Sequence, residues 1–171
     1  MTVSSANYLK GFYDATRNMG DKAIVSDASF EIEGFESMYL LTPQFPTPTL
    51  SSGGEIEVPT PLGGAAWQPQ QLKIHQQGSV TLMETTAGHV SDLMLRLLTG
   101  GSQGRFNAKI YEGTPDKFYR AYRITDCFMQ LENPDRNWED RSQILKLTGT
   151  IFFHYFGEVI PGNTKPTNFF G

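Results

Sequence analysis

Three histidines are the first residues in this chain that could bind a metal or move a proton. His75, His89 and His154 fall on three separate predicted elements, and no cysteine or carboxylate stands beside them at metal-ligand spacing. Protein zinc sites usually combine three or four such ligands, so we expect polar-face or capping histidines and no metal site. Cofactor motifs are absent too, since the sequence has no GxSxG elbow, no GxxxxGK[ST] loop and no GxGxxG turn. We therefore expect no cofactor.

Two glutamates and one cysteine are the next candidates for catalysis. Glu31 and Glu33 lie two residues apart on a predicted strand and so share one face. A solvated acidic face explains them better than an acid–base pair, because their surroundings offer nothing that such chemistry requires. The single cysteine, Cys127, lies inside an apolar strand, which indicates a small buried thiol rather than a nucleophile.

Two polar segments resemble binding sites only superficially. Asp135 and Asp140 lie in one loop, but they lack the spacing of calcium-binding loops, so we expect turns and surface salt bridges there. Aromatic and basic residues alternate over 118–123, as in a platform for single-stranded nucleic acid. The net charge of −4 argues against that role, because affinity for phosphate backbones comes chiefly from Lys and Arg. These patterns together favour a protein that is not an enzyme.

Composition limits the remaining classes. A chain of 171 residues with 39% hydrophobic and 19% charged residues is typical of one folded domain. One cysteine cannot form an intrachain disulfide, which fits a reducing compartment. No run of about 18 apolar residues occurs and the first 20 residues lack a signal-peptide core, so we expect synthesis in a cytoplasm without membrane insertion.

The stretch from Gln71 to Leu98 gives the clearest structural pattern. Residues 71–83 alternate between apolar and polar side chains, which predicts a strand with one buried and one water-facing side. Residues 90–98 then follow helical spacing, with Thr85 or Thr86 as the cap and Gly100–Gly101 as the stop. The strand's apolar side comprises Leu72, Ile74, Val80 and Leu82; its polar side comprises Gln71, Lys73, His75, Gln77, Ser79 and Thr81; and the helical stripe comprises Val90, Leu93, Met94, Leu97 and Leu98.

The other segments complete a mainly β chain. Ser5 can cap a short helix with an apolar stripe that ends near Gly20. Strands are predicted at 28–35, 105–111, 118–129 and 143–156, with a polar loop at 133–141. We expect a β-sandwich or partly closed barrel with one flanking helix and the short N-terminal helix.

Two segments depart from the alternating pattern: an excursion within the predicted core of residues 28–156, and the C-terminal segment beyond it. Residues 42–70 contain six prolines and repeated glycine pairs, so we expect a long excursion with at most short edge-like strands around 55–58. Residues 157–171 show no period but contain Phe169 and Phe170 near the end. The excursion carries the apolar anchors Ile56, Val58, Leu62 and Trp67, which a flexible linker would lack.

The order of these pieces resembles the tail tube proteins of contractile-tailed bacteriophages, which are related to type VI secretion tube proteins. The resemblance covers roughly residues 28–156. It implies one tail-tube-like domain of residues 1–171, with 28–156 as the core, 1–20 as an N-terminal extension, 42–70 as a long loop or hairpin excursion and 157–171 as a C-terminal arm. It rests on these segments in sequence: Phe30-Glu31-Ile32, Phe45-Pro46, Glu55-Ile56-Glu57-Val58-Pro59, Gly78-Ser79-Val80-Thr81-Leu82-Met83-Glu84, the 90–98 helix, Phe106-Asn107-Ala108-Lys109-Ile110-Tyr111, Tyr122-Arg123-Ile124-Thr125-Asp126-Cys127-Phe128 and Leu147-Thr148-Gly149-Thr150-Ile151-Phe152-Phe153.

This resemblance implies a structural subunit of a virion tail, assembled in the host cytoplasm. Six copies would form a ring, and stacked rings would form a channel through which genomic DNA passes without specific binding. Sheath, baseplate and terminator proteins would be partners. The expected channel-facing residues are Glu31, Glu33, Gln71, Lys73, His75, Gln77, Ser79 and Thr81, and the expected contacts between subunits or rings are Ile56, Val58, Leu62, Trp67, Phe169 and Phe170.

Two alternatives remain open at this point. A baseplate tube initiator or a tail-end component would have the same fold but would form one ring only. A small ligand-binding β-barrel, with aromatic side chains around a pocket, would belong to another class altogether.

Overall fold

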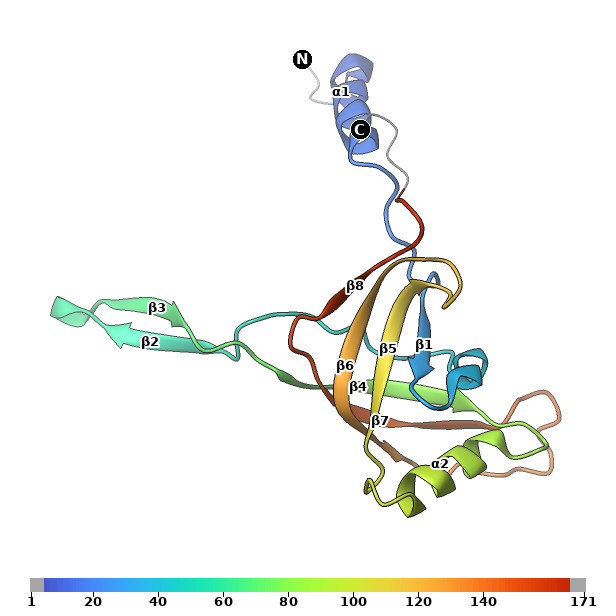
Figure 1. The fold of residues 1–171 in the computed structure, drawn as a ribbon. Coiled ribbons are helices and arrows are strands. Elements are labelled where there is room, and N and C mark those ends of the chain that lie inside the picture. Colours follow the sequence, from blue (N-terminus) through green and yellow to red (C-terminus); the bar gives the residue numbers. More distant parts are fainter. Residues whose placement is uncertain (1–4, 167–171) are drawn as a thin grey trace.

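Alternating apolar residues build one six-stranded antiparallel sheet in the computed structural model, which describes residues 5–166 (Figure 1). Five strands are hydrogen-bonded in the order β1-β5-β6-β7-β4, and β8 pairs with the free edge of β6. Their bounds are β1 Ser29–Ile32, β4 His75–Met83, β5 Phe106–Gly113, β6 Phe118–Leu131, β7 Lys146–His154 and β8 Val159–Pro161. The predicted mainly β class is confirmed.

The long strand β6 belongs to both layers of the structure. Its first half pairs with β5 and β8, whereas its second half pairs with β7. The register shifts between Thr125 and Phe128, where Asp126 has a φ of +48°. A bulge of this kind bends a strand and lets it pass from one layer to the next. Figure 1 accordingly shows β5 and upper β6 crossing the direction of β4 and β7.

Side chains from both layers fill the space between them. The apolar positions predicted from alternation are buried on β1, β5 and β7, where Phe30, Ile110 and Phe153 are at most 2% exposed. The helix α2 (His89–Thr99) contributes Val90 and Leu93 to the same core. The interior is therefore occupied by side chains, which argues against a barrel that holds a ligand among them.

The predicted α2 is confirmed, with two corrections. Leu98 was expected in the buried stripe but is 62% exposed, because the contact with the core ends at Leu97. The expected threonine cap is only partly right: Thr85 Oγ1 accepts a hydrogen bond from the His89 amide at 3.3 Å, but Glu84 accepts bonds from two further amides of the first turn. The helix ends as predicted, with Gly101 at a φ of +82°.

Two elements stand away from this body (Figure 1). The strands β2 (Glu55–Pro59) and β3 (Ala65–Pro69) form a two-stranded hairpin, joined by a short 3₁₀ turn η2 (Pro61–Gly63). We call residues 55–69 the arm. The N-terminal helix α1 (Ala6–Asn18) lies at the opposite end from α2, and a second 3₁₀ turn, η1 (Glu36–Leu41), follows β1.

The sequence missed part of this architecture. The excursion was expected as a loop or hairpin with short edge-like strands around 55–58. It is a hairpin, and its second strand, β3, which was not located from the sequence, pairs with β2 along its whole length. Residues 71–74 were expected to belong to a strand, but β4 begins at His75. The C-terminal extension was expected to reach neighbouring subunits, whereas β8 pairs with β6 of its own chain and Asn163 Nδ2 donates to Asp116 O at 2.7 Å. Residues 157–166 are therefore held by their own chain, and their contact with neighbouring subunits stays a prediction.

Candidate assembly interface

The polar residues considered for catalysis are engaged in structural contacts. Arg123 Nε lies 3.1 Å from Glu33 Oε1, and the Tyr111 hydroxyl donates to Glu31 Oε1 at 3.4 Å. Burial, reinforced by these two carboxylates, raises the pKa of Tyr111. Glu31 and Glu33 thus bind neighbouring side chains at the edge of the sheet around β1 and do not form an acid–base pair.

The single thiol is inert, as its sequence position predicted. Cys127 is fully buried in the core. Burial, with smaller contributions from Asp126 and Glu33, raises its pKa to about 12. A thiol in that state supplies almost no thiolate near neutral pH, so it is not a nucleophile.

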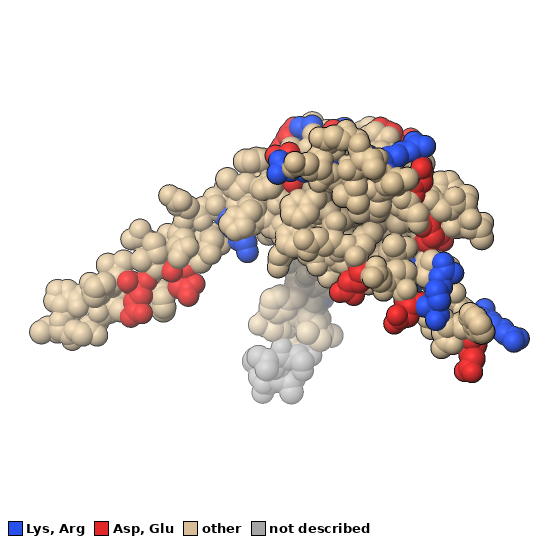
Figure 2. Space-filling view, turned by 90° about the horizontal axis from the view of Figure 1, so that it is seen from below, with Lys and Arg blue, Asp and Glu red and all other residues tan. Residues whose placement is uncertain are grey.

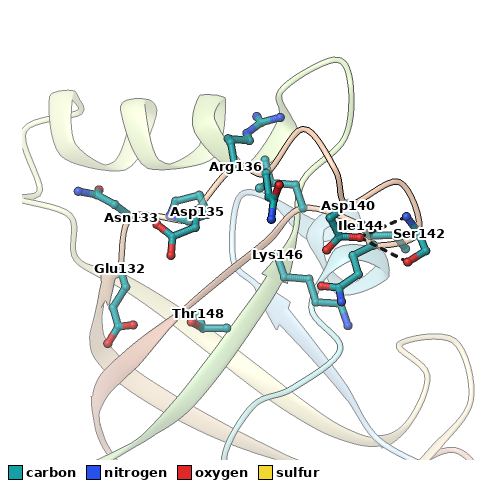
Figure 3. A pocket seen from close by; sticks show the side chains of 13 residues that line it. Glu132, Asn133, Asp135, Arg136, Asp140, Ser142, Ile144, Lys146 and Thr148 are labelled. Carbon is teal, nitrogen blue, oxygen red and sulfur yellow. Dashed lines mark hydrogen bonds between the residues drawn. The ribbon is translucent and has the colours of Figure 1, made fainter.

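The loop that follows β6 forms an open polar cleft of about 690 Å³ (Figure 3). Its lining comes from the continuous segment between Glu132 and Thr148, and the sticks in Figure 3 show carboxylates spread along the loop rather than converging on one point. Asp140 Oδ1 accepts bonds from the Ser142 amide and hydroxyl, which confirms the predicted turn chemistry. The prediction of salt bridges in this loop is wrong, since none of the ion pairs among residues 5–166 involves a residue of the loop. Within that same range, no three histidine, cysteine or acidic side chains gather as a metal would require.

The arm is the largest departure from a self-contained domain. Trp67 is 74% exposed and Leu62, at the tip, is fully exposed with a φ of +62°. Ile56 and Val58 lie on one face of the hairpin, and Trp67 lies on the other, opposite Glu57. Figure 2 shows the arm projecting from the body, with acidic side chains along its middle and an uncharged tip. A two-stranded hairpin is marginal in water unless another surface covers it, so the arm is a candidate interface.

The helix α1 is also exposed and partly apolar, and it is a candidate interface that was not predicted from the sequence. None of its residues is buried, although Tyr8, Leu9, Phe12 and Tyr13 make one apolar side. Tyr8 and Phe12 contact each other edge to face, with ring centroids 5.0 Å apart. A 13-residue helix with no buried residue is marginal in water. The sequence does show the apolar stripe of α1. It does not show whether that stripe is buried against the body or left exposed.

The predicted channel-facing residues do not form one continuous face. His75, Gln77 and Ser79 lie exposed on β4, and Gln71 and Lys73 lie exposed just before it, at the root of the arm. Glu31 and Glu33 lie at the other edge of the sheet, where three strands separate β1 from β4.

Thr81 corrects the prediction for β4 itself. It is only 6% exposed because the segment around Gln44 covers it, and its hydroxyl donates to Gln44 Oε1 at 2.9 Å. Phe169 and Phe170, expected at subunit contacts, lie outside the described residues.

Solved structures show where this architecture recurs. One neighbour is a chain in the PVC sheath–tube complex of an extracellular contractile injection system, with a TM-score of 0.55 and 10% identity over 85% of this chain and 95% of that one. A second is a chain in the PVC sheath/tube terminator, with a TM-score of 0.54 and 12% identity over 82% of this chain and 96% of that one. A third is a chain in the anti-feeding prophage baseplate, with a TM-score of 0.53 and 13% identity over 85% of this chain and 100% of that one. This chain has the fold of contractile injection tube proteins. No protein-family model and no curated protein sequence matches it.

The comparison supports the sequence-based resemblance at the level of the fold. The neighbours are structural tube, terminator and baseplate components rather than enzymes, in line with the predicted non-enzymatic role. No helix among residues 5–166 is both long and apolar enough to cross a membrane.

Proposed function

We propose that this chain is the structural subunit of a contractile phage tail tube, assembling as stacked six-membered rings around a channel for DNA ejection. It would reside in the tail of the virion after assembly in the host cytoplasm. Support comes from the shared fold, and the six-fold ring is in keeping with the 6-fold symmetrised baseplate that contains one of the neighbours.

The exposed apolar arm is the observation that carries the proposal. Its two faces and tip present Ile56, Val58, Leu62 and Trp67 to water in the single chain. Apolar surface of this kind is typical of protein interfaces, where aromatic side chains are enriched. A copy of the same chain in an adjacent ring is the partner that a repeating tube supplies at every position.

The proposed channel wall follows from polarity rather than from contacts. His75, Gln77 and Ser79 lie on the exposed side of β4 and carry no acidic or basic run. With a net charge of −4 for the chain, such a wall would let DNA slide rather than bind it. Sheath, baseplate and terminator proteins would contact the outer surface and the ends of the tube.

A tube initiator or terminator is the second candidate, because the terminator and baseplate neighbours match almost as well as the tube neighbour. The ligand-binding barrel receives no comparable support, since buried aromatic residues such as Phe30 and Phe153 fill the core.

Mass photometry and sedimentation velocity of the purified chain over a concentration series distinguish these functions. A tube subunit should form open-ended polymers that lengthen with concentration. An initiator or terminator should stop at one closed ring. A monomer at every concentration would refute both.

A further inference from the structure

The fold brings together two histidines that lie far apart in the sequence, on separate predicted elements. His75 begins β4 and His154 ends β7, and the two are direct cross-strand partners in the antiparallel ladder. β4 and β7 run side by side in Figure 1. On β7, the neighbouring residue Phe153 faces the core, so both histidines lie on the outer side of the sheet.

The ladder places this pair at a position where side chains approach closely. The amide of Tyr155 donates to Ile74 O at 3.0 Å, which makes the preceding pair, Ile74 with Tyr155, the hydrogen-bonded one. The amide of Thr81 donates away from β7, to Gln44 O at 3.0 Å, as expected if odd-numbered residues of β4 are at non-hydrogen-bonded positions. His75 and His154 therefore form a non-hydrogen-bonded pair, whose Cα atoms are typically about 4.5 Å apart.

A backbone contact also fixes which ring nitrogen of His154 is free. His154 Nδ1 lies 3.3 Å from Thr125 O. A carbonyl oxygen can only accept, so Nδ1 carries the hydrogen and Nε2 of the neutral ring keeps its lone pair. A hydrogen bond from the second ring nitrogen to a backbone carbonyl is the usual outer-shell arrangement of metal-binding histidines.

We propose that His75 and His154 together bind one divalent transition-metal ion of the class that prefers imidazole, such as Ni²⁺, Zn²⁺ or Cu²⁺. The two rings supply both protein ligands, and water completes the coordination. His75 is exposed and can turn toward the ion, while the Thr125 carbonyl orients His154.

The bound ion would tie the start of β4 to β7 at the root of the arm. That root otherwise rests on a few contacts, among them the bridge between Ser52 and Leu72 and the bond from Lys73 N to Ser51 O at 2.9 Å. The site does not depend on the proposed tube function, because it lies within one chain.

Isothermal titration of the untagged full chain with Ni²⁺ tests the site. We expect one ion per chain, and we expect His75→Ala and His154→Asn each to weaken binding by at least about tenfold. His89→Ala is the matched control, because His89 is an exposed histidine on α2 and lies outside the pair. It should bind as the unaltered chain does. Ni²⁺ should also raise the thermal midpoint of the unaltered chain and of His89→Ala, but not that of His75→Ala.

Unchanged Ni²⁺ affinity in His75→Ala would overturn the proposal, as would an equal loss in His89→Ala or no binding by the unaltered chain. Circular dichroism shows whether His154→Asn still folds. If it does not, His75→Ala decides the question alone, since an exposed residue at the start of a strand tolerates alanine.

Discussion

Replacing Trp67 with alanine should weaken assembly while leaving the monomer intact. The side chain is 74% exposed in the single chain and lies on the arm, opposite Glu57. Truncation removes little buried surface there, so the free energy of unfolding should change by no more than about 0.5 kcal/mol.

The cost to assembly follows from the exposed surface of the indole. A tryptophan buries roughly 200 Å² when it is fully covered, so the exposed part of Trp67 amounts to roughly 150 Å². At about 25 cal/mol per Å², complete coverage by a neighbouring subunit contributes about 4 kcal/mol to each contact. Since about 1.4 kcal/mol corresponds to a tenfold change, Trp67→Ala should lower the association constant by between about 100-fold and about 1,000-fold.

Sedimentation velocity over a concentration series measures this change, with Trp138→Ala as the matched control. Trp138 is 97% exposed but lies on the polar loop of the body, away from the arm. It should assemble like the unaltered chain. Equal assembly of the Trp67 and Trp138 variants would refute the role given to the arm. An unfolded Trp67 variant would refute the prediction that the monomer stays intact.

Three further predictions concern the folded chain. Glu84→Gln should lower the free energy of unfolding by about 1 kcal/mol and reduce the loss of stability in acid, as urea unfolding at several pH values would reveal. Burial alone would raise the pKa of Glu84, but the hydrogen bonds from helix amides and from a serine outweigh burial and lower that pKa. The stability that Glu84 contributes is therefore present above its ordinary pKa and is lost as pH falls through the lowered pKa. Gly149→Ala should lower the free energy of unfolding by about 3 kcal/mol, because the added Cβ would meet Gln130 O. Gly11→Ala in α1 is the control: its Cβ meets nothing within 4 Å, so it should not destabilise the chain. A denaturation midpoint for Gly149→Ala equal to that of the unaltered chain would be the contrary result. Cys127 should react with a thiol reagent only as fast as the chain unfolds, and fast labelling of the native protein would show that its burial is wrong.

Periodicity predicted the parts of the fold whose stability comes from one buried face. Phe106, Ala108 and Ile110 on β5, and Val90 and Leu93 on α2, lie in the core as their spacing indicated. A buried face imposes a period of two on a strand and of 3.6 on a helix, and that period is visible in a single sequence.

Elements that depend on long-range contacts were harder to predict. β8 is three residues long and includes a proline, so it shows no period, and it forms only because the first half of β6 has a free edge. Thr81 shares the parity of exposed residues, but parity identifies a face and cannot show that Gln44 covers it.

The candidate interface was predicted in part, for a related reason. Apolar residues in a proline-rich and glycine-rich excursion indicated Trp67 and Leu62, because a linker does not need them. The apolar side of α1, including Phe12, was not assigned, since only the fold shows that this helix lies away from the body. An apolar surface is visible in the sequence, but the sequence does not show whether the same chain or a second molecule covers it.

Electron microscopy of the purified chain tests most directly whether it is a self-assembling tube subunit. We expect end-on views of six-membered rings with an open centre and side views of rings stacked into tubes. Single particles with the mass of one chain, under conditions in which the arm is intact, would contradict it.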